Sequence, residues 1–275
     1  MTVAASLGTK FAARLAFGVA VATLAVVALA DLWAPIPAAA AQAVPPPEGC
    51  DVPQSYVESE IELTDVTKET TDRHRLDISV IGTGSSALSG TDGAHFAYPA
   101  RLEDALKTRL TGIDVNVTAH VQNRATTAVM AQGLAKILAD DKPILVIWQA
   151  GTADALSGIE PEDFRTSLDD GVAAIQAAGA DVILLNMQYS PRTESMLDVS
   201  AYADVMHAVA QQRGALLFDR LALMHYWNDA GTFDLYTATK KYDMARRVHD
   251  CIGWGLASQI INAAHLDAVR MQTTR

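Results

Sequence analysis

Short apolar runs alternate with longer amphipathic segments along most of the 275-residue chain, and this order restricts the possible folds more than any other feature. Four of the runs are predominantly apolar, which is typical of strands buried on both faces of a sheet. Another run, residues 113–121, alternates apolar and polar positions, as a half-buried strand near a sheet edge does. The four apolar runs are residues 76–81, 143–148, 181–187 and 215–218.

Segments with apolar residues at helical spacing follow the predicted strands. They cover residues 98–110, 126–139, 161–178 and 199–213, and residues 219–265 indicate further helices joined by loops. Strand and helix therefore alternate about five times, which predicts a parallel sheet with helices on both faces. We expect one doubly wound α/β domain with three layers, α/β/α, over residues 76–267.

The amino terminus predicts an export signal and not a part of that domain. Lys10 and Arg14 precede the apolar residues 15–30, and a stretch of small residues ends at Ala43. This pattern is typical of a signal peptide over residues 1–43 that is cleaved after Ala43. An uncleaved membrane anchor is the alternative, although the apolar run is short for a membrane span. We expect an exported protein, periplasmic or secreted, with no membrane attachment after cleavage.

Two further segments flank the predicted domain, and both cysteines lie in the predicted exported part. Residues 44–75 begin with prolines and become polar and charged, which indicates a covering segment with room for a short helix, and residues 268–275 form a tail. Cys50 and Cys251 are the two cysteines of the chain. An oxidising compartment favours one disulfide between them, and two buried free thiols are the alternative.

The charge of the chain bears on its partners. Removal of residues 1–43 leaves 19 basic and 31 acidic residues, a formal net charge of −12. An acidic protein of this kind offers no basic surface to nucleic acid or anionic lipid. His95, His120 and His207 have no acidic or cysteine neighbours at the spacing of metal ligands, so we expect neither a metal nor a cofactor.

The loop after the first predicted strand has the composition of a catalytic turn. Gly82, Gly84 and Gly90 surround Ser85 and Ser86. Open α/β sheets carry their chemistry at the carboxyl ends of the strands, so a serine here can be a nucleophile if a base reaches it. A glycine-rich turn with two solvated serines is the structural alternative.

Two other segments supply groups for the same chemistry. Gly151 and Asp154 follow the strand at residues 143–148, and His249 is interpreted as part of a late loop at the same edge of the sheet. A serine, a histidine base and donors for an oxyanion are the components of serine-based acyl transfer.

These segments together resemble the sequence blocks of the GDSL or SGNH hydrolases, a family of esterases and lipases with a flavodoxin-like fold. Residues 84–90 match the spacing of the family's first block, with Ser86 as nucleophile and Ser85 as a second candidate, and residues 151–154 match the third block at both ends. An exported bacterial branch, in which Gly-Ser-Ser-Ser-Thr replaces Gly-Asp-Ser, is the most similar. The resemblance implies a flavodoxin-like sheet of about five strands and an acyl-enzyme mechanism with His249 as base.

Three positions differ from the family pattern. Ala153 replaces an oxyanion-binding asparagine, and its side chain cannot donate a hydrogen bond. The loop after the second strand lacks the usual glycine, and Asn123 is the candidate to act in its place. Arg246 replaces the aspartate that orients the histidine. The candidates for orienting the histidine or binding the oxyanion are then Asp154, Gly151, Asp243 and Asp250.

The resemblance implies an exported ester hydrolase that acts on a small-molecule or glycan-borne ester, such as an O-acetyl group. The altered positions leave two alternatives open. One is an envelope binding or accessory protein that keeps the fold without catalysis. The other is an acyltransferase, which forms the same acyl-enzyme but passes the acyl group to a sugar.

Overall fold

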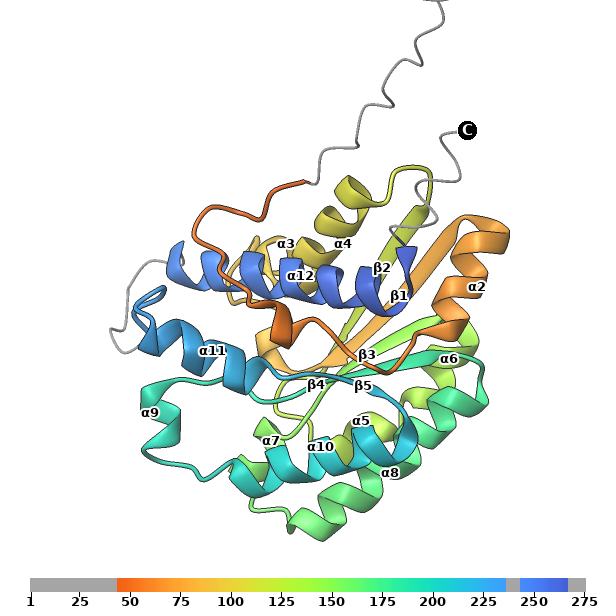
Figure 1. The fold of residues 1–275 in the computed structure, drawn as a ribbon. Coiled ribbons are helices and arrows are strands. Elements are labelled where there is room, and N and C mark those ends of the chain that lie inside the picture. The colour runs from red at the N-terminus through yellow and green to blue at the C-terminus, as the bar shows by residue number, and fades with distance from the viewer. Residues whose placement is uncertain (1–43, 236–242, 267–275) are drawn as a thin grey trace, which may run out of the picture. The chain divides into compact units, whose positions relative to one another are not determined.

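The computed structural model describes residues 44–235 and 243–266, which form a five-stranded parallel sheet in the order β2-β1-β3-β4-β5 (Figure 1). The predicted signal peptide, residues 1–43, and the predicted tail, residues 268–275, lie outside the described residues. The strands are β1 (Arg75–Gly82), β2 (Asp114–Val121), β3 (Leu145–Gln149), β4 (Asp181–Leu185) and β5 (Leu216–Phe218).

The strand order and the parallel pairing confirm the predicted doubly wound fold. In β1, Ile78 pairs with Val117 of β2 on one side and with Leu145 of β3 on the other. All residues of β3 are buried, whereas β2 is largely half-buried or exposed. The alternating run at residues 113–121 therefore forms an edge strand, as its pattern predicts.

One face of the sheet is covered by four long helices and by the segment that precedes β1 (Figure 1). Short elements on this side are η2 (Gln54–Tyr56) and α3 (Gly93–Phe96). The apolar side chains of the long helices pack on β1, β3, β4 and β5 in one continuous core. These helices are α2 (Thr64–Arg73), α4 (Tyr98–Arg109), α11 (Arg220–Asp229) and α12 (Asp243–Ala263).

The other face carries a second apolar core beneath α5 (Thr127–Ala131), α6 (Leu134–Asp141), α8 (Pro161–Ala177) and α10 (Ser200–Arg213) (Figure 1). The short elements η3 (Gly84–Ser86), α7 (Thr152–Leu156) and α9 (Pro191–Glu194) follow β1, β3 and β4. The single helix predicted over residues 126–139 is wrong, because the chain forms two helices that are separated at Gln132 and Gly133. Glycine disfavours a helix interior, and its low propensity is consistent with this break.

The close packing of α4 against α12 determines where the later site residues lie. A side chain on Gly253 of α12 would come within 2.7 Å of the backbone nitrogen of Leu102 on α4. Only glycine permits this approach, so the two helices lie nearly in backbone contact. Tyr98 at the start of α4 and His249 in α12 are brought together by the same packing.

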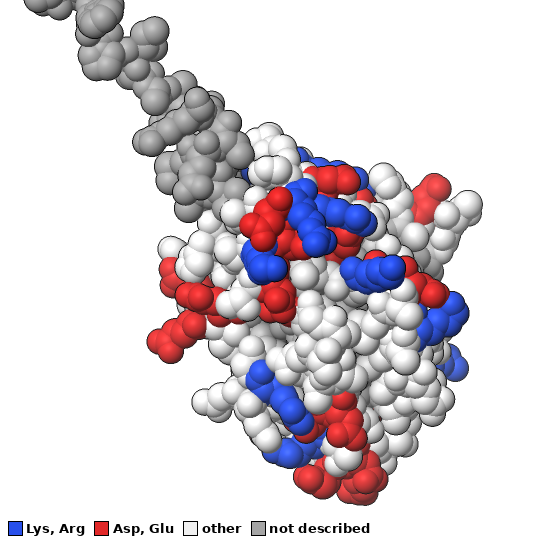
Figure 2. Space-filling model, turned by 90° about the vertical axis from the view of Figure 1, so that its right-hand side faces the viewer, with Lys and Arg blue, Asp and Glu red and all other residues white. Residues whose placement is uncertain are grey.

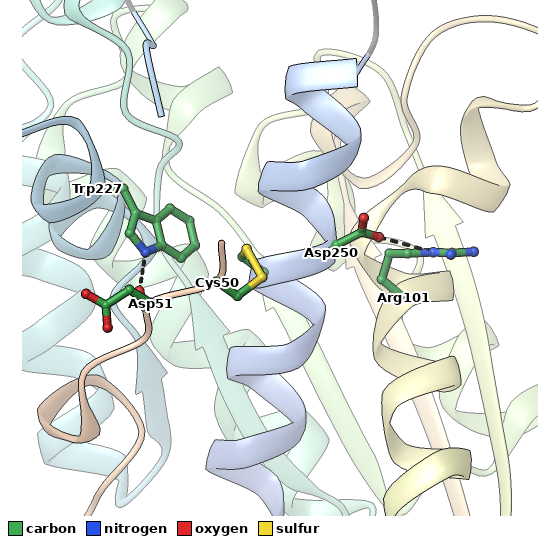
Figure 3. Close-up of a disulfide and its surroundings, with 6 residues drawn as sticks. Cys50, Asp51, Arg101, Trp227 and Asp250 are labelled. Carbon is green, nitrogen blue, oxygen red and sulfur yellow. Dashed lines mark hydrogen bonds and ion pairs between the residues drawn. A yellow bond between two sulfur atoms is a disulfide. The ribbon is translucent and has the colours of Figure 1, made fainter. Parts of the chain in front are cut away.

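A disulfide joins the amino-terminal segment to α12 and confirms the predicted pairing of Cys50 with Cys251 (Figure 3). Next to it, the indole nitrogen of Trp227 donates a hydrogen bond to the backbone carbonyl of Asp51. The carboxylate of Asp181 at the start of β4 accepts a hydrogen bond of 2.9 Å from the backbone nitrogen of Val66 in α2. The segment before β1 is thus fixed to β4 of the sheet, to α11 through Trp227 and to α12 through the disulfide.

Basic and acidic side chains lie beside one another on the face shown in Figure 2. Ion pairs within one helix include Lys107 with Glu103 at 2.6 Å in α4 and Arg73 with Glu69 at 3.2 Å in α2. Within residues 44–235 and 243–266, none of the helices has both the length and the apolar character that a membrane crossing needs.

Candidate active site

The candidate site lies where the strand order reverses, at the carboxyl ends of β1 and β3. These two strands are neighbours in the sheet, and Ile81 of β1 pairs with Trp148 of β3. β1 ends at Gly82 and β3 ends at Gln149, so the two following turns start side by side. Ligands of doubly wound sheets bind in the crevice at such a reversal.

The side chain of Gln149 organises the turn after β1. Its Oε1 atom accepts hydrogen bonds from Ser86 Oγ at 2.6 Å, from Ser85 Oγ at 3.1 Å and from the backbone nitrogen of Thr83 at 3.3 Å. Its Nε2 atom donates to Thr83 Oγ1 at 3.0 Å. The backbone donor of Thr83 requires an acceptor, which fixes the orientation of the amide. Sequence reasoning did not place Gln149 among the catalytic candidates, although a polar residue at the end of an apolar strand is the available signal.

The two serines occupy different environments. Ser86 is 2% exposed, and its Oγ atom lies 2.9 Å from the hydroxyl of Tyr98. Because the proton of Ser86 goes to Gln149, the hydroxyl of Tyr98 donates to Ser86. Ser85 is only partly buried, and its Oγ atom accepts a long hydrogen bond of 3.4 Å from Nη1 of Arg220. Both hydroxyls therefore make internal hydrogen bonds, and Ser85 is the more exposed of the two serines.

A glycine before the turn makes this arrangement possible. A Cβ atom on Gly82 would lie 2.2 Å from Ser86 Oγ and 2.9 Å from Oε1 of Gln149. Any side chain at this position would displace the serine or the amide.

His249 lies in the second turn of α12, so the sequence-based interpretation of a loop is wrong. Its Nδ1 atom accepts a hydrogen bond of 2.8 Å from the backbone nitrogen of Tyr98, and its ring stacks on the Tyr98 ring at 6.0 Å between centroids. Burial, together with the positive charge of Arg220, lowers the pKa of His249 to about 3. The imidazole is therefore neutral at pH 7 and carries its proton on Nε2, where it is a hydrogen-bond donor.

Tyr98 connects His249 to the turn after β1, which carries Ser85 and Ser86 and is called the serine turn below. Sequence reasoning did not identify Tyr98 as a site residue. Its hydroxyl contacts Ser86, and its backbone nitrogen contacts His249. Burial raises the pKa of Tyr98 to about 12, so the hydroxyl keeps its proton. Among the described residues, the hydrogen bonds of both serine hydroxyls go to Gln149, Tyr98 and Arg220 and not to His249.

Arg220 is the third functional candidate, after Gln149 and Tyr98, that the sequence did not indicate. It is the first residue of α11, directly after the cap residue Asp219, and its exposed fraction is 0%. Its Nε and Nη2 atoms are buried and have no hydrogen-bond partner in the part of the chain that the structure describes. Burial lowers the pKa of Arg220 to about 10, which leaves the guanidinium charged at neutral pH. A buried arginine carries no periodic pattern in the sequence, so only the structure reveals it.

The predicted acidic partners of His249 have other contacts. The carboxylate of Asp154 is buried and accepts hydrogen bonds of 2.9 Å from both the backbone nitrogen and the hydroxyl of Thr127. Asp250 lies 3.9 Å from Nε of Arg101 beside the disulfide (Figure 3), and burial raises the pKa of Asp250. Asp243 is exposed at the first position of α12. Of the described hydrogen bonds and ion pairs, none joins these carboxylates to His249.

The predicted oxyanion candidates lie at the same edge of the sheet. Asn123 is exposed in the loop after β2, and its Oδ1 atom is 3.2 Å from the position of a Cβ on Gly84. Gly151 precedes α7 with a φ of 96°, and a side chain there would meet the sulfur of Met187 at 2.4 Å. Ala153 is buried in α7.

A pocket of about 330 Å³ opens at this edge beyond β4. Tyr189 and His225 stack in its wall at 3.6 Å between ring centroids, and Glu194 lies 3.3 Å from Nε2 of His225. Leu221, the neighbour of Arg220, also lines the pocket. Ser85 and Arg220 themselves are not among the residues that line the pocket.

The five-stranded parallel sheet and its strand order are those of the SGNH-hydrolase-like three-layer fold, as the sequence resemblance implies. Residues 49–266 match the non-GDSL lipase-like family, and the chain belongs to this family. It is 30% identical to Esterase TesA of Pseudomonas aeruginosa over 138 residues, which are 50% of this chain and 67% of TesA. These relationships support an ester hydrolase as the general class.

Solved structures show the same fold. A crystal structure of TesA superposes with a TM-score of 0.56 at 24% identity and covers 68% of this chain and 99% of TesA. The acetyl xylan esterase AlAXEase superposes with a TM-score of 0.59 at 11% identity and covers 68% of this chain and 100% of that chain.

Proposed function

We propose that the protein is an exported hydrolase of small carboxylic esters and that Ser85 is its nucleophile. The observation that carries this proposal is the position of the Ser85 hydroxyl. It is partly accessible at the carboxyl edge of the central strands, between the carboxamide of Gln149 and the guanidinium of Arg220. Membership of the lipase-like family and the similarity to an esterase support the same reaction class.

Ser85 is preferred over Ser86 because of access. Ser86 is 2% exposed and holds both Gln149 and Tyr98. Its role in the proposal is to position Gln149, which in turn accepts a hydrogen bond from the hydroxyl of Ser85. This reverses the sequence-based preference, in which Ser86 is the nucleophile and Ser85 the second candidate.

For His249 to take the proton of Ser85, its imidazole must change orientation. A general base must offer a lone pair to the hydroxyl. The Nδ1 lone pair of His249 is used by the backbone nitrogen of Tyr98, and Nε2 carries the proton. The proposal therefore includes a turn of the imidazole that frees a lone pair for Ser85 and breaks the bond from Tyr98.

The substrate that we propose has a short acyl group and includes O-acetyl groups on glycans. The pocket of about 330 Å³ beside Leu221 has aromatic and acidic walls, which suit the hydroxyl-rich alcohol part of such an ester. The name of the neighbouring structure, acetyl xylan esterase, is consistent with this class. Export follows from the predicted signal peptide over residues 1–43, and amino-terminal sequencing of the protein from culture or periplasm tests it: a first residue of Val44 supports cleavage.

The experiment for the reaction is turnover of a short-chain aryl ester by the parent protein, Ser85→Ala, Ser86→Ala and His249→Ala. We expect Ser85→Ala to fall to background and Ser86→Ala to keep part of the activity. His249→Ala should lose about a hundredfold or more if the imidazole acts as base. Equal activity of Ser85→Ala and the parent protein would remove Ser85 from the mechanism.

A binding protein without catalysis is the second candidate, and one observation favours it. His249 is held neutral with Nδ1 engaged, an arrangement in which it does not act as a base. This candidate predicts no ester turnover in the parent protein, together with binding of acetylated glycans that Ser85→Ala does not weaken. Acyl transfer to an added glycan that exceeds hydrolysis would instead identify an acyltransferase.

A further inference from the structure

We propose that Arg220 is a catalytic residue that binds the negatively charged oxygen formed on the substrate carbonyl when Ser85 attacks. This inference rests on the proposed function and goes beyond it. It assigns to the guanidinium the role of the side-chain donor that is missing at Ala153.

The position of Arg220 is fixed by the elements around it. Asp219 Oδ1 accepts hydrogen bonds from the backbone nitrogen of Ala222 at 3.0 Å and from Nδ2 of Asn186 at 2.7 Å. Oδ1 of Asn186 in turn accepts a hydrogen bond of 2.9 Å from the backbone nitrogen of Leu221. These hydrogen bonds connect the start of α11 to the residue that follows β4. They hold the backbone of α11 in place where the guanidinium of Arg220 contacts Ser85. Preorganised donors of this kind are the ones that stabilise developing charge.

The guanidinium has unused hydrogen-bonding capacity. Within residues 44–235 and 243–266, its Nη1 atom makes the long contact of 3.4 Å to Ser85, while Nε and Nη2 are buried without a partner. The ion pairs of the described residues do not include Arg220. Burying a cation and leaving its donors unsatisfied costs free energy, about 1–3 kcal/mol for each neutral donor and more for a charged one. An anion that forms beside Ser85 would satisfy these donors during the reaction.

The chemistry balances without consuming Arg220. The Oγ atom of Ser85 forms a bond to the carbonyl carbon, the π electron pair moves to the carbonyl oxygen, and the serine proton passes to His249. The guanidinium donates to the oxyanion. When the carbonyl re-forms, the bond to the alkoxy oxygen breaks and the alcohol leaves with the proton. Water then attacks the acyl-enzyme and gives its proton to His249, which returns it to Oγ of Ser85 as the bond to the acyl group breaks. The carboxylic acid loses its proton to solvent and becomes a carboxylate, which is again an anion beside Arg220.

The kinetic test compares the full chain with Arg220→Gln, Arg220→Lys and Arg220→Ala in the hydrolysis of an aryl acetate. Loss of one oxyanion donor lowers kcat by about a hundred- to a thousandfold. We expect this loss in Arg220→Gln with little change of KM, and a smaller loss in Arg220→Lys. Millimolar guanidinium should restore part of kcat in Arg220→Ala. Arg213→Gln is the matched control, because Arg213, the last residue of α10, pairs with Asp169 of α8 and not with the serine turn. The activity of this variant should equal that of the parent protein.

A second measurement does not depend on turnover. Acetate, the product anion, should raise the Tm of the parent protein and of Arg213→Gln but not of Arg220→Gln. If the parent protein is inactive yet acetate stabilises it through Arg220, the proposed hydrolysis fails while the anion site stands. If the acetate effect and kcat are both unchanged in folded Arg220→Gln, the inference is overturned. Should Arg220→Gln fail to fold, Arg220→Lys and guanidinium rescue decide in the same way.

Discussion

The backbone nitrogen of Tyr98 donates a hydrogen bond of 2.8 Å to Nδ1 of His249, and this bond selects the tautomer of the buried, neutral histidine. With Nδ1 engaged, the neutral ring carries its proton on Nε2. The same helix contact brings the Tyr98 hydroxyl to Ser86, so one residue of α4 links the serine turn to α12. The contact therefore couples the chemistry of the site to the stability of the fold.

The first prediction concerns the pH dependence of stability. The pKa of His249 is about 3 in the folded protein and is higher, near 6.5, in the unfolded chain. Between these values the unfolded chain binds one more proton, so the free energy of unfolding falls as the pH decreases. We expect a slope of about 1.4 kcal/mol per pH unit from this residue. Urea unfolding between pH 7 and pH 4 measures it.

The control is His249→Gln, whose amide oxygen can still accept the hydrogen bond from Tyr98. The difference between parent and variant cancels the opposite contribution of Asp181, because burial raises the pKa of Asp181 to about 6 in both proteins. The variant should lose less stability than the parent protein as the pH falls. Parallel curves for the two proteins would show that His249 titrates normally in the fold.

A second prediction concerns the close contact between Gly82 and Ser86 in the serine turn. In Gly82→Ala the new methyl group would lie 2.2 Å from Ser86 Oγ, so the turn must shift. We expect a loss of about 1–3 kcal/mol in stability and of about a hundredfold in turnover. Gly133→Ala is the control, since its nearest neighbour is 3.5 Å away. Full activity in Gly82→Ala would show that the turn adapts to a side chain.

A third prediction separates the catalytic contribution of Gln149 from its contribution to stability. Gln149→Met leaves the backbone nitrogen of Thr83 and the buried hydroxyl of Ser86 without their acceptor. Each unsatisfied group costs about 1–3 kcal/mol, and turnover should fall because Ser85 loses its orientation. Gln259→Met removes another buried amide, which donates to the carbonyl of Leu217 at 3.1 Å, and should affect stability alone. Equal turnover in the two variants would contradict the role of Gln149.

A fourth prediction concerns the disulfide. Cys50 and Cys251 are 201 residues apart, so their bond restricts most of the unfolded domain. The double replacement Cys50→Ser with Cys251→Ser should lower the free energy of unfolding by about 2–5 kcal/mol. A reducing agent should destabilise the parent protein by a similar amount and leave the double variant unchanged. A double variant as stable as the oxidised parent protein would contradict this account.

The sheet could be predicted because its signals are local. The apolar run at residues 143–148 and the alternating run at 113–121 each carry the burial pattern of a single strand, and the structure confirms both as strands. The pairing of Cys50 with Cys251 followed from the number of cysteines. The break at Gly133 was missed because the apolar spacing continues across it.

The site could be predicted only in part. Ser85 and Ser86 stand out because glycines surround them, but their different exposure depends on Gln149 and Tyr98, which lie on other elements. Asp154 was a plausible partner of His249 by position, yet its carboxylate caps α5 through Thr127. Such contacts depend on side-chain directions across the fold, and no local pattern encodes them. The role of Arg220 could not be predicted from the sequence for the same reason.

The most direct test of the central claim is the identification of the residue that an alkyl fluorophosphonate labels. Such a probe reacts with an activated serine hydroxyl, and mass spectrometry of the peptides locates the adduct. The account predicts one adduct on Ser85 in the parent protein, an adduct on the same residue in Ser86→Ala, and none in Ser85→Ala. An adduct on Ser86, or no adduct on the folded parent protein, would contradict it.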